Sequence, residues 1–412
     1  MTLSSTRPVL VLLALGLFAI GTDGYVITSL LPDVGHALGV SDSAAGQLIT
    51  VFALAYAVGA PVLGVLTGGL PRRPLLIGSL AVFALTNAGV AIAGSYPVMM
   101  VVRVLAALAA AVFTPACSAT AAVLAADGRR GRALATVAAG VSLSTALGVP
   151  LGALVGAAFG WRVTFLAIAV LAALATAGLA LLLPSVRTPP ATGLRARIAV
   201  ARTRGVPTAL GLTVLWIAGA FTVLTYVNPV LGDLAGVRGS GLAVWLLVFG
   251  VAAVAGNAVG GRAADRYPAT SLAVVTTAGL ALALTTFGVL ASLGVHGRTG
   301  MVAAAVVLAV WGVFGWAFMP VQQHRLVELA AGDAGVVLSL SASATYIGIS
   351  LGGFAGSLAL TSGGVAAVGW TAGAIESCAV LAAIAIAVAH RRRVRGVRAA
   401  AAGMDTATSP TR

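Results

Sequence analysis

The sequence predicts an all-α integral membrane protein with twelve transmembrane helices in two pseudo-symmetric six-helix halves. Hydrophobic residues make up 60% of the 412 residues, charged residues only 8%, and the mean hydropathy is +1.07. A soluble domain carries about 25% charged residues, so this chain lacks the polar surface that a water-soluble globule needs. The apolar residues also fall in runs of about 20, which is the length that crosses a bilayer as a helix.

Twelve such runs can be placed along the chain, at 9–31, 45–67, 74–94, 98–124, 133–158, 163–183, 207–230, 241–263, 270–292, 300–321, 335–360 and 370–389. The longest gap, 184–206, is rich in proline and arginine, which predicts a cytoplasmic linker between two halves, 1–183 and 207–390. Residues 391–412 form a basic and polar cytoplasmic tail, whose end we expect to lack regular structure.

The basic residues predict the orientation in the membrane. All 24 are arginine, and 20 of them fall in segments that are cytoplasmic if the N-terminus is cytoplasmic. Cytoplasmic loops carry an excess of basic residues, so we expect both termini in the cytoplasm and the chain in the cell membrane. The preference for Arg, Ala, Gly and Val suggests a bacterium with a GC-rich genome. The short arginine clusters between apolar runs argue against a nucleic-acid partner, despite the net charge of +14.

The two predicted halves share a sequence repeat. The pattern T-x-x-G-x-x-L-G-x-x-x-G occupies 145–156 in the fifth run and 345–356 in the eleventh. Phe113-Thr-Pro115 and Phe318-Met-Pro320 correspond in the same way in the fourth and tenth runs. Many secondary transporters are built from such internal repeats.

Loops at equivalent places in the two halves share a pattern of glycine and charged residues. The loop after the second run contains Gly64, Arg72 and Arg73 of the pattern G-x-x-x-D-R-x-G-R-[KR], with Gly68 in the place of the aspartate. Its counterpart after the eighth run contains Gly261 and keeps the acid and the base, Asp265 and Arg266. This pattern resembles a motif of the major facilitator superfamily, and within it of the drug:proton antiporter branch. The resemblance implies that these loops gate the cytoplasmic side by latching the halves together.

Two further motifs support this resemblance across the whole chain. Arg103 lies inside the fourth run and is followed by alanines, which resembles a family motif whose arginine takes part in proton coupling. Gly148-Val-Pro150-Leu-Gly152 resembles the antiporter signature of the fifth helix. An extra residue, Val149, separates the glycine from the proline, which is similar to the signature in relatives of chloramphenicol and arabinose-type exporters. The resemblance therefore implies export.

Asp23 is the first candidate for a proton site because it lies inside the first apolar run. A charged residue near the bilayer centre costs about 2.5–3.5 kcal/mol on insertion scales, so an acid kept there is a functional candidate. Asp23 could bind and release a proton as the cavity opens alternately to the two sides of the membrane. In the family that this chain resembles, an acid of the first helix has this role. A structural acid bonded to small helix-face groups is the alternative. Glu376 in the twelfth run is the other intramembrane acid and a second coupling candidate.

A cavity for amphipathic molecules needs aromatic side chains and a few polar groups. The candidates within the runs are Tyr25, Phe52, Tyr56, Phe113, Tyr226, Asn228, Trp311, Trp316 and Tyr346. We also expect Asn228-Pro229 to break the seventh helix, because transporters use broken helices at their binding sites.

These observations predict a proton-coupled exporter of small amphipathic compounds, antibiotics in particular, that works by alternating access. An exporter or importer of sugars, nucleosides or amino acids remains open, although the runs hold few amides and acids. A membrane-embedded enzyme would need clustered histidines or paired acids, and the sequence shows neither. A non-transporting sensor or scaffold is the third alternative. We expect no metal, no cofactor and a monomer, with protons, a small molecule and the bilayer as partners.

Overall fold

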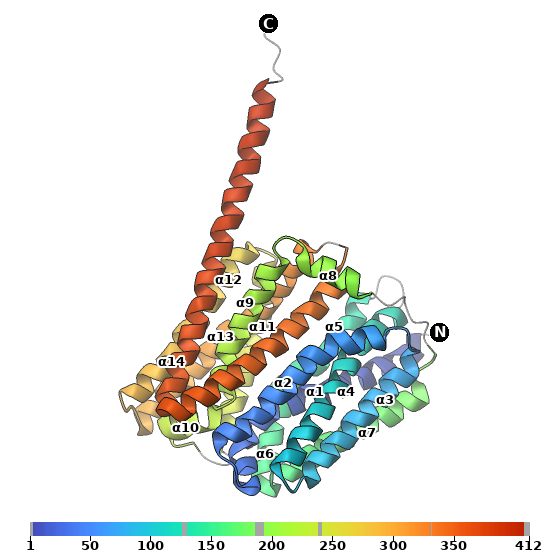
Figure 1. Ribbon diagram of the computed structural model, residues 1–412, viewed down its shortest axis with the longest axis vertical. Helices are drawn as coiled ribbons and strands as arrows, with labels where there is room; N and C mark the ends of the chain where they lie inside the picture. The colour runs from blue at the N-terminus through green and yellow to red at the C-terminus, as the bar shows by residue number, and fades with distance from the viewer. Residues whose placement is uncertain (1–2, 126–129, 186–192, 238–240, 331, 408–412) are drawn as a thin grey trace.

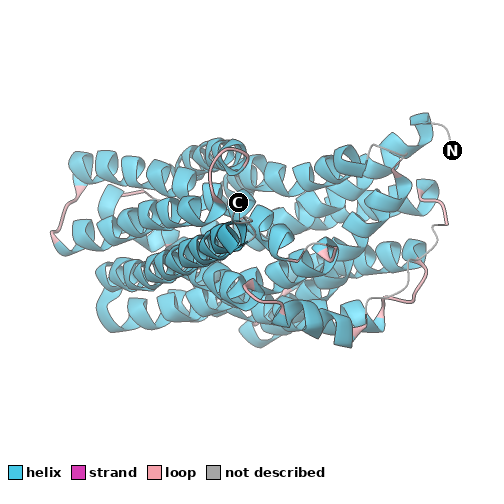
Figure 2. Cartoon of the chain, turned by 90° about the horizontal axis from the view of Figure 1, so that it is seen from above, coloured by secondary structure: helices cyan, strands magenta, loops and turns pink. Residues whose placement is uncertain are grey.

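The computed structural model describes residues 3–125, 130–185, 193–237, 241–330 and 332–407. Every regular element in these residues is a helix, and they contain no strand (Figure 2). The first half of the chain supplies α1 (Leu3–Leu38), α2 (Asp42–Leu66), α3 (Arg72–Ile92), α4 (Tyr96–Leu124), α5 (Arg130–Leu143), the π-helical turn η1 (Ser144–Gly148), α6 (Val149–Phe159) and α7 (Trp161–Leu182). The second half supplies α9 (Val206–Leu224), α10 (Val227–Ala235), α11 (Gly241–Ala264), α12 (Ala269–Ser292), α13 (Gly297–Leu329) and α14 (Ala334–Ala407).

The short helix α8 (Leu194–Arg202) lies in the predicted linker. Residues 186–192 of that linker, and residues 408–412 of the predicted tail, lie outside the described residues. The domain boundaries at 183, 206 and 390 therefore remain predictions.

Eleven helices in the described part of the chain are long and apolar enough to cross a membrane, and α14 supplies two crossings. It turns back on itself at Gly363 and Gly364, where Gly364 has φ 67° and ψ −156°. Only glycine adopts this backbone conformation readily, so the turn needs no separate loop. The prediction of twelve spanning helices is thus confirmed (Figure 1). The second stretch of α14 continues as a helix through Ala407, so most of the predicted tail is helical, and the expectation for the very end of the tail falls outside the described residues.

Proline positions explain why two predicted spans are divided. The seventh span is broken between α9 and α10, because Pro229 has no N–H to donate to the carbonyl of Thr225 and its ring would crowd that carbonyl. The fifth span contains η1, where the Val149 N–H donates to Ser144 O before Pro150. The predicted break at Asn228-Pro229 therefore occurs about one turn earlier, at Thr225 and Tyr226.

The repeated glycines allow close helix contacts in both halves. Those of η1 and α6 face α1, in the pairs Gly148–Thr22, Gly152–Val26 and Gly156–Leu30. Those of α14 face α9, in the pairs Gly348–Ile217, Gly352–Phe221 and Gly356–Thr222. A Cβ atom at any of the six positions would overlap the neighbouring helix. The 200-residue repeat in the sequence is thus a repeat of one helix-packing arrangement, which supports the prediction of two pseudo-symmetric halves.

Candidate functional site

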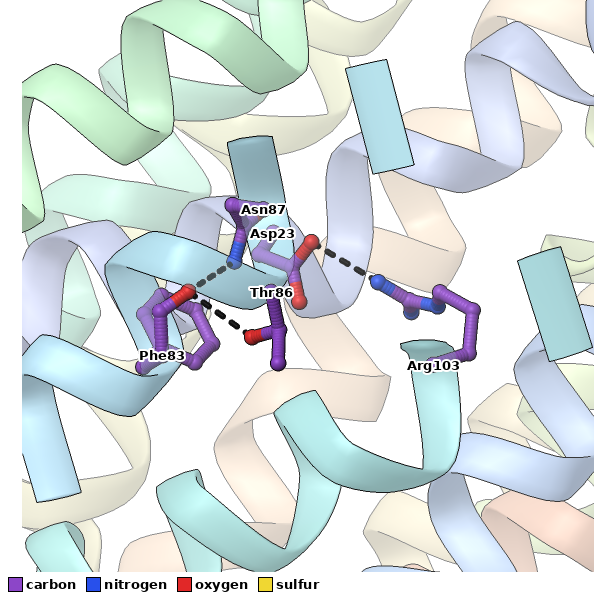
Figure 3. Close-up of polar contacts among 5 residues, drawn as sticks. All are labelled: Asp23, Phe83, Thr86, Asn87 and Arg103. Atoms are coloured by element: carbon purple, nitrogen blue, oxygen red, sulfur yellow. Dashed lines mark hydrogen bonds and ion pairs between the residues drawn. The ribbon is translucent and has the colours of Figure 1, made fainter. Parts of the chain in front are cut away.

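Asp23 of α1 and Arg103 of α4 form a buried ion pair. The distance between Asp23 Oδ1 and Arg103 Nη1 is 2.7 Å, and their side chains are 0% and 1% exposed. Figure 3 shows the carboxylate pointing toward the guanidinium across the space between the two helices. The Phe52 ring of α2 lies 4.3 Å from the Arg103 Cζ, close enough for a cation–π contact. The structure thus brings together two residues that are 80 positions apart in the sequence.

The pair does not use all of its hydrogen-bonding capacity. Asp23 Oδ2 and Arg103 Nε have no partner among the described residues. Thr86 and Asn87 of α3, drawn with the pair in Figure 3, donate instead to the carbonyl of Phe83 in their own helix. An ionised carboxylate can accept about four hydrogen bonds, so its desolvation is only partly compensated here. Such a pair is easier to open than a fully bonded one.

Aromatic residues from both halves surround this pair. Tyr56 of α2 stacks on Tyr346 of α14, with ring centroids 3.6 Å apart and planes inclined by 21°. Phe52, which contacts Arg103, lies 6.5 Å from the same Tyr346 ring. The two halves therefore meet through these rings, one of which, Phe52, contacts Arg103.

A small cavity lies between the halves, and one of its lining residues, Tyr25, follows closely after Asp23 in the sequence. Tyr25 lines it from α1 and Trp316 from α13, and their ring centroids are 6.2 Å apart. The remaining lining residues are Thr28, Thr145, Val149, Leu224, Leu246 and Phe249. The cavity measures about 20 Å³, which is room for about one water molecule. A drug-sized molecule needs about 300–1,000 Å³, so the halves must separate before one can bind.

A larger groove of about 550 Å³ lies elsewhere, between α2, α3 and α4. Its lining is almost entirely apolar and includes none of the candidate residues. We therefore place the candidate site at the cavity between the halves.

Seven of the nine predicted cavity residues do not line this cavity: Phe52, Tyr56, Phe113, Tyr226, Asn228, Trp311 and Tyr346. Phe113 fills the space beside Gly16 in the packing between α4 and α1. Trp311 packs on Phe249 and Phe287, with centroids 4.9 and 6.2 Å apart, inside the second half. Both rings fill gaps between packed helices rather than line the cavity.

Tyr226 and Asn228 hold the two halves together at the end of the bundle where α1 ends and α2 begins. The Tyr226 hydroxyl lies beside Gly46 of α2, and the Asn228 Nδ2 donates to Ser29 O of α1 at 3.3 Å. At the same end, Ser43 Oγ and Ser357 Oγ are 2.5 Å apart. These contacts close that end of the interface.

In the part of the chain that the structure describes, no hydrogen bond or ion pair joins the predicted gating residues to one another. Arg73 donates to Ala180 O of α7 at 2.7 Å. The side chain of Arg72, the preceding residue, is partly buried. Among the described residues, Asp265 and Arg266 form no ion pair, and a Cβ at Gly261 would meet nothing within 4 Å. The halves are bridged at this end by the linker helix instead.

Arg197 of α8 makes that bridge. Its guanidinium lies against Gly64 of α2, and its Nη1 donates to Ser339 Oγ of α14 at 3.5 Å. The sequence marked Arg197 only as one of the linker arginines. Thr28, Phe221 and Phe249 near the cavity were also missed, because apolar and hydroxyl residues are common in every span.

Glu376 lies in the second half, on the second stretch of α14 and against α9. Its side chain is 0% exposed, and neither carboxyl oxygen has a hydrogen-bond partner among the described residues. The two predicted proton-coupling acids therefore belong to different halves.

Comparisons with known proteins agree with this arrangement. A family model of the Major Facilitator Superfamily matches residues 13–353. The chain is 36% identical over 380 residues to the "Chloramphenicol resistance protein" of Streptomyces lividans, covering 91% of this chain and 95% of that one. It is 32% identical over 354 residues to the "Inner membrane transport protein YdhP" of Escherichia coli K12, covering 86% and 89%.

Solved structures support the fold alone, because their sequence identity to this chain is only 16%. A D-xylose-proton symporter matches with a TM-score of 0.75, covering 93% of this chain and 97% of that one. A bacterial homologue of the lysosomal transporter Spinster, in an inward-facing and occupied conformation, matches with a TM-score of 0.77, covering 95% and 98%. The chain therefore belongs to the major facilitator superfamily, whose members carry small molecules across membranes.

Proposed function

We propose that this transporter is a proton-coupled exporter of small amphipathic compounds in the cell membrane of a bacterium, with both termini in the cytoplasm. The 36%-identical chloramphenicol resistance protein supports antibiotics as the substrate class. The arginine distribution supports the orientation, because basic residues stay on the cytoplasmic side. This orientation puts the end held by Ser43 and Ser357 outside the cell and Arg197 inside it.

The observation that carries the proposal is the buried Asp23–Arg103 ion pair beside aromatic residues of both halves. Asp23 can take up a proton, whereas an arginine in a protein does not lose one. Protonation would leave Arg103 as an unpaired buried cation with only the Phe52 ring beside it. Breaking a buried pair in this way is unfavourable, so a proton on Asp23 favours a conformation in which Arg103 reaches water or another acceptor.

The proton gradient can drive export without ATP. A membrane potential contributes about 2.3 kcal/mol per charge per 100 mV, which corresponds to roughly a fifty-fold concentration ratio for each proton. Protons would bind Asp23 from outside and leave to the cytoplasm, while the substrate moves in the opposite direction. The two ligands need not touch, because the conformation couples them.

The cavity lining supports uncharged or amphipathic cargo. It consists of aromatic and aliphatic side chains with the hydroxyl groups of Tyr25, Thr28 and Thr145, and it includes no charged residue. A sugar site would need more amides and acids to satisfy the many hydroxyl groups of its ligand. We therefore favour antibiotics over sugars, nucleosides or amino acids.

The test measures chloramphenicol accumulation in cells that express the protein, with and without a protonophore. We expect the wild type to lower accumulation, and the protonophore or Asp23→Asn to abolish this effect. Asp33→Asn is the matched control, because Asp33 lies on the same helix and is exposed. Unchanged accumulation of chloramphenicol and of every other compound in an antibiotic panel would exclude drug efflux. Full activity in Asp23→Asn would exclude the coupling role.

A further inference from the structure

Glu376 is buried between the second stretch of α14 and two neighbouring helices. A Cβ atom at Gly219 of α9 would lie 2.6 Å from Glu376 Oε2. One turn before Glu376, Gly373 packs on Thr285 of α12. The carboxyl therefore occupies a space that exists only because residue 219 has no side chain.

No positive charge is available to this carboxyl. Neither α9 nor α12 contains a single charged or titratable residue. On the second stretch of α14 the nearest titratable groups in sequence are Cys378, which is exposed, and His390 and Arg391 near the end of the spanning segment. The ion pairs found in the described residues, Asp23–Arg103 and His324–Glu328, do not involve Glu376.

A carboxylate in these surroundings would be an isolated buried charge. Proteins avoid this state by neutralising the group rather than paying for its desolvation. The carboxyl of Glu376 is therefore neutral in this conformation and carries a proton. Asp23 has a different environment, because the guanidinium of Arg103 lies 2.7 Å away and favours the ionised carboxylate.

We propose that Glu376 is the proton-exchanging acid of the second half, and that it holds its proton in the conformation in which Asp23 has released its own. This rests on the proposed proton-coupled transport. A movement of α9 relative to α14 would expose Glu376 to water. The break between α9 and α10, after Leu224, lies less than two turns beyond Gly219 and can act as the joint for that movement.

The first readout is chemical and requires no substrate. Dicyclohexylcarbodiimide, an apolar carbodiimide, reacts with neutral carboxyl groups. The carboxyl proton moves to one nitrogen of the reagent while the carboxyl oxygen bonds to its central carbon. The acyl group then migrates to nitrogen, so the stable product contains the whole reagent and no leaving group. The full chain in lipid nanodiscs is treated with the reagent and its peptides are mapped by mass spectrometry.

We expect Glu376 to be labelled, and Asp23 to be labelled at least several-fold less because it is paired. Labelling should fall as the pH rises. Gly219→Ala should change the rate of Glu376 labelling several-fold because the added methyl group displaces the carboxyl. Gly211→Ala should leave the rate unchanged, since it is the same change on the same helix at a position with open space. An unlabelled Glu376, or labelling that does not depend on pH, would overturn the proposal.

The second readout separates coupling from a structural role. Gln has the size of a neutral Glu but cannot exchange a proton, so Glu376→Gln should fold and bind chloramphenicol as the wild type does. We expect it to lose at least several-fold of the gradient-driven accumulation, with fewer protons moved per substrate in proteoliposomes. Wild-type coupling in Glu376→Gln would show that the acid is only structural and overturn the proposal. If wild-type proteoliposomes do not move chloramphenicol, the proposed drug efflux fails, while the labelling result still decides whether Glu376 exchanges a proton.

Discussion

The ion pair between Asp23 and Arg103 permits a quantitative test by a double-mutant cycle. At 2.7 Å the attraction between two unit charges is about 6 kcal/mol for an effective dielectric constant of about 20, before the desolvation of both groups is subtracted. Removing one partner of a buried pair typically costs about 3–5 kcal/mol, because the other charge stays buried alone. We therefore expect Asp23→Asn to lower the free energy of unfolding by about 3–5 kcal/mol.

The substitution Arg103→Gln should lower the free energy of unfolding by less than Asp23→Asn does. In Arg103→Gln the remaining carboxyl of Asp23 can take up a proton, whereas the guanidinium left in Asp23→Asn cannot lose one. In the double variant the two amides can bond to each other, so its loss should not exceed that of Asp23→Asn. The free energies come from reversible unfolding of purified protein in mixed micelles. Additive losses, which correspond to a coupling energy near zero, would refute the electrostatic argument.

Two further predictions address the helix packing and the interface between the halves. A Cβ at Gly140 would overlap Ala14 O, so Gly140→Ala should lower the free energy of unfolding by about 1–3 kcal/mol. Gly211→Ala, where the space is open, should raise it by up to about 1 kcal/mol, and losses of equal size in the two variants would contradict this packing. Ser43→Cys with Ser357→Cys, in a Cys378→Ser background, should form a disulfide on oxidation, stop chloramphenicol transport and regain transport after reduction. Transport that continues through the oxidised form would mean that this end need not open.

Much of this architecture could be predicted from the sequence because the bilayer restricts the possible structures. Apolar length predicted twelve crossings, and the repeated glycine pattern predicted two similar halves. Asp23 and Arg103 could be singled out because each is a charged residue inside an apolar span. Two opposite charges in the same half need each other, and the structure places them in contact.

The residues that line the cavity were harder to predict from the sequence than the spans. Every span is apolar on most of its surface, so the sequence does not distinguish the faces toward lipid, toward other helices and toward the substrate. Phe113 and Trp311 looked like cavity residues for this reason, yet both pack within one half. The bridge formed by Arg197 depends on how the two halves sit relative to each other, which no local pattern encodes.

The state of the ion pair and the state of the interface together indicate where the conformation lies in the proposed cycle. The contacts of Ser43, Tyr226 and Asn228 close the end that the arginine distribution assigns to the outside. At the opposite end, no hydrogen bond or ion pair among the described residues joins the predicted gating residues, and Arg197 reaches Ser339 Oγ of α14 at 3.5 Å. An antiporter that has released its proton to the cytoplasm should be closed to the outside, with its coupling acid ionised. The Asp23–Arg103 contact favours that charge state, so the closed outer end and the paired acid support the same step of the cycle.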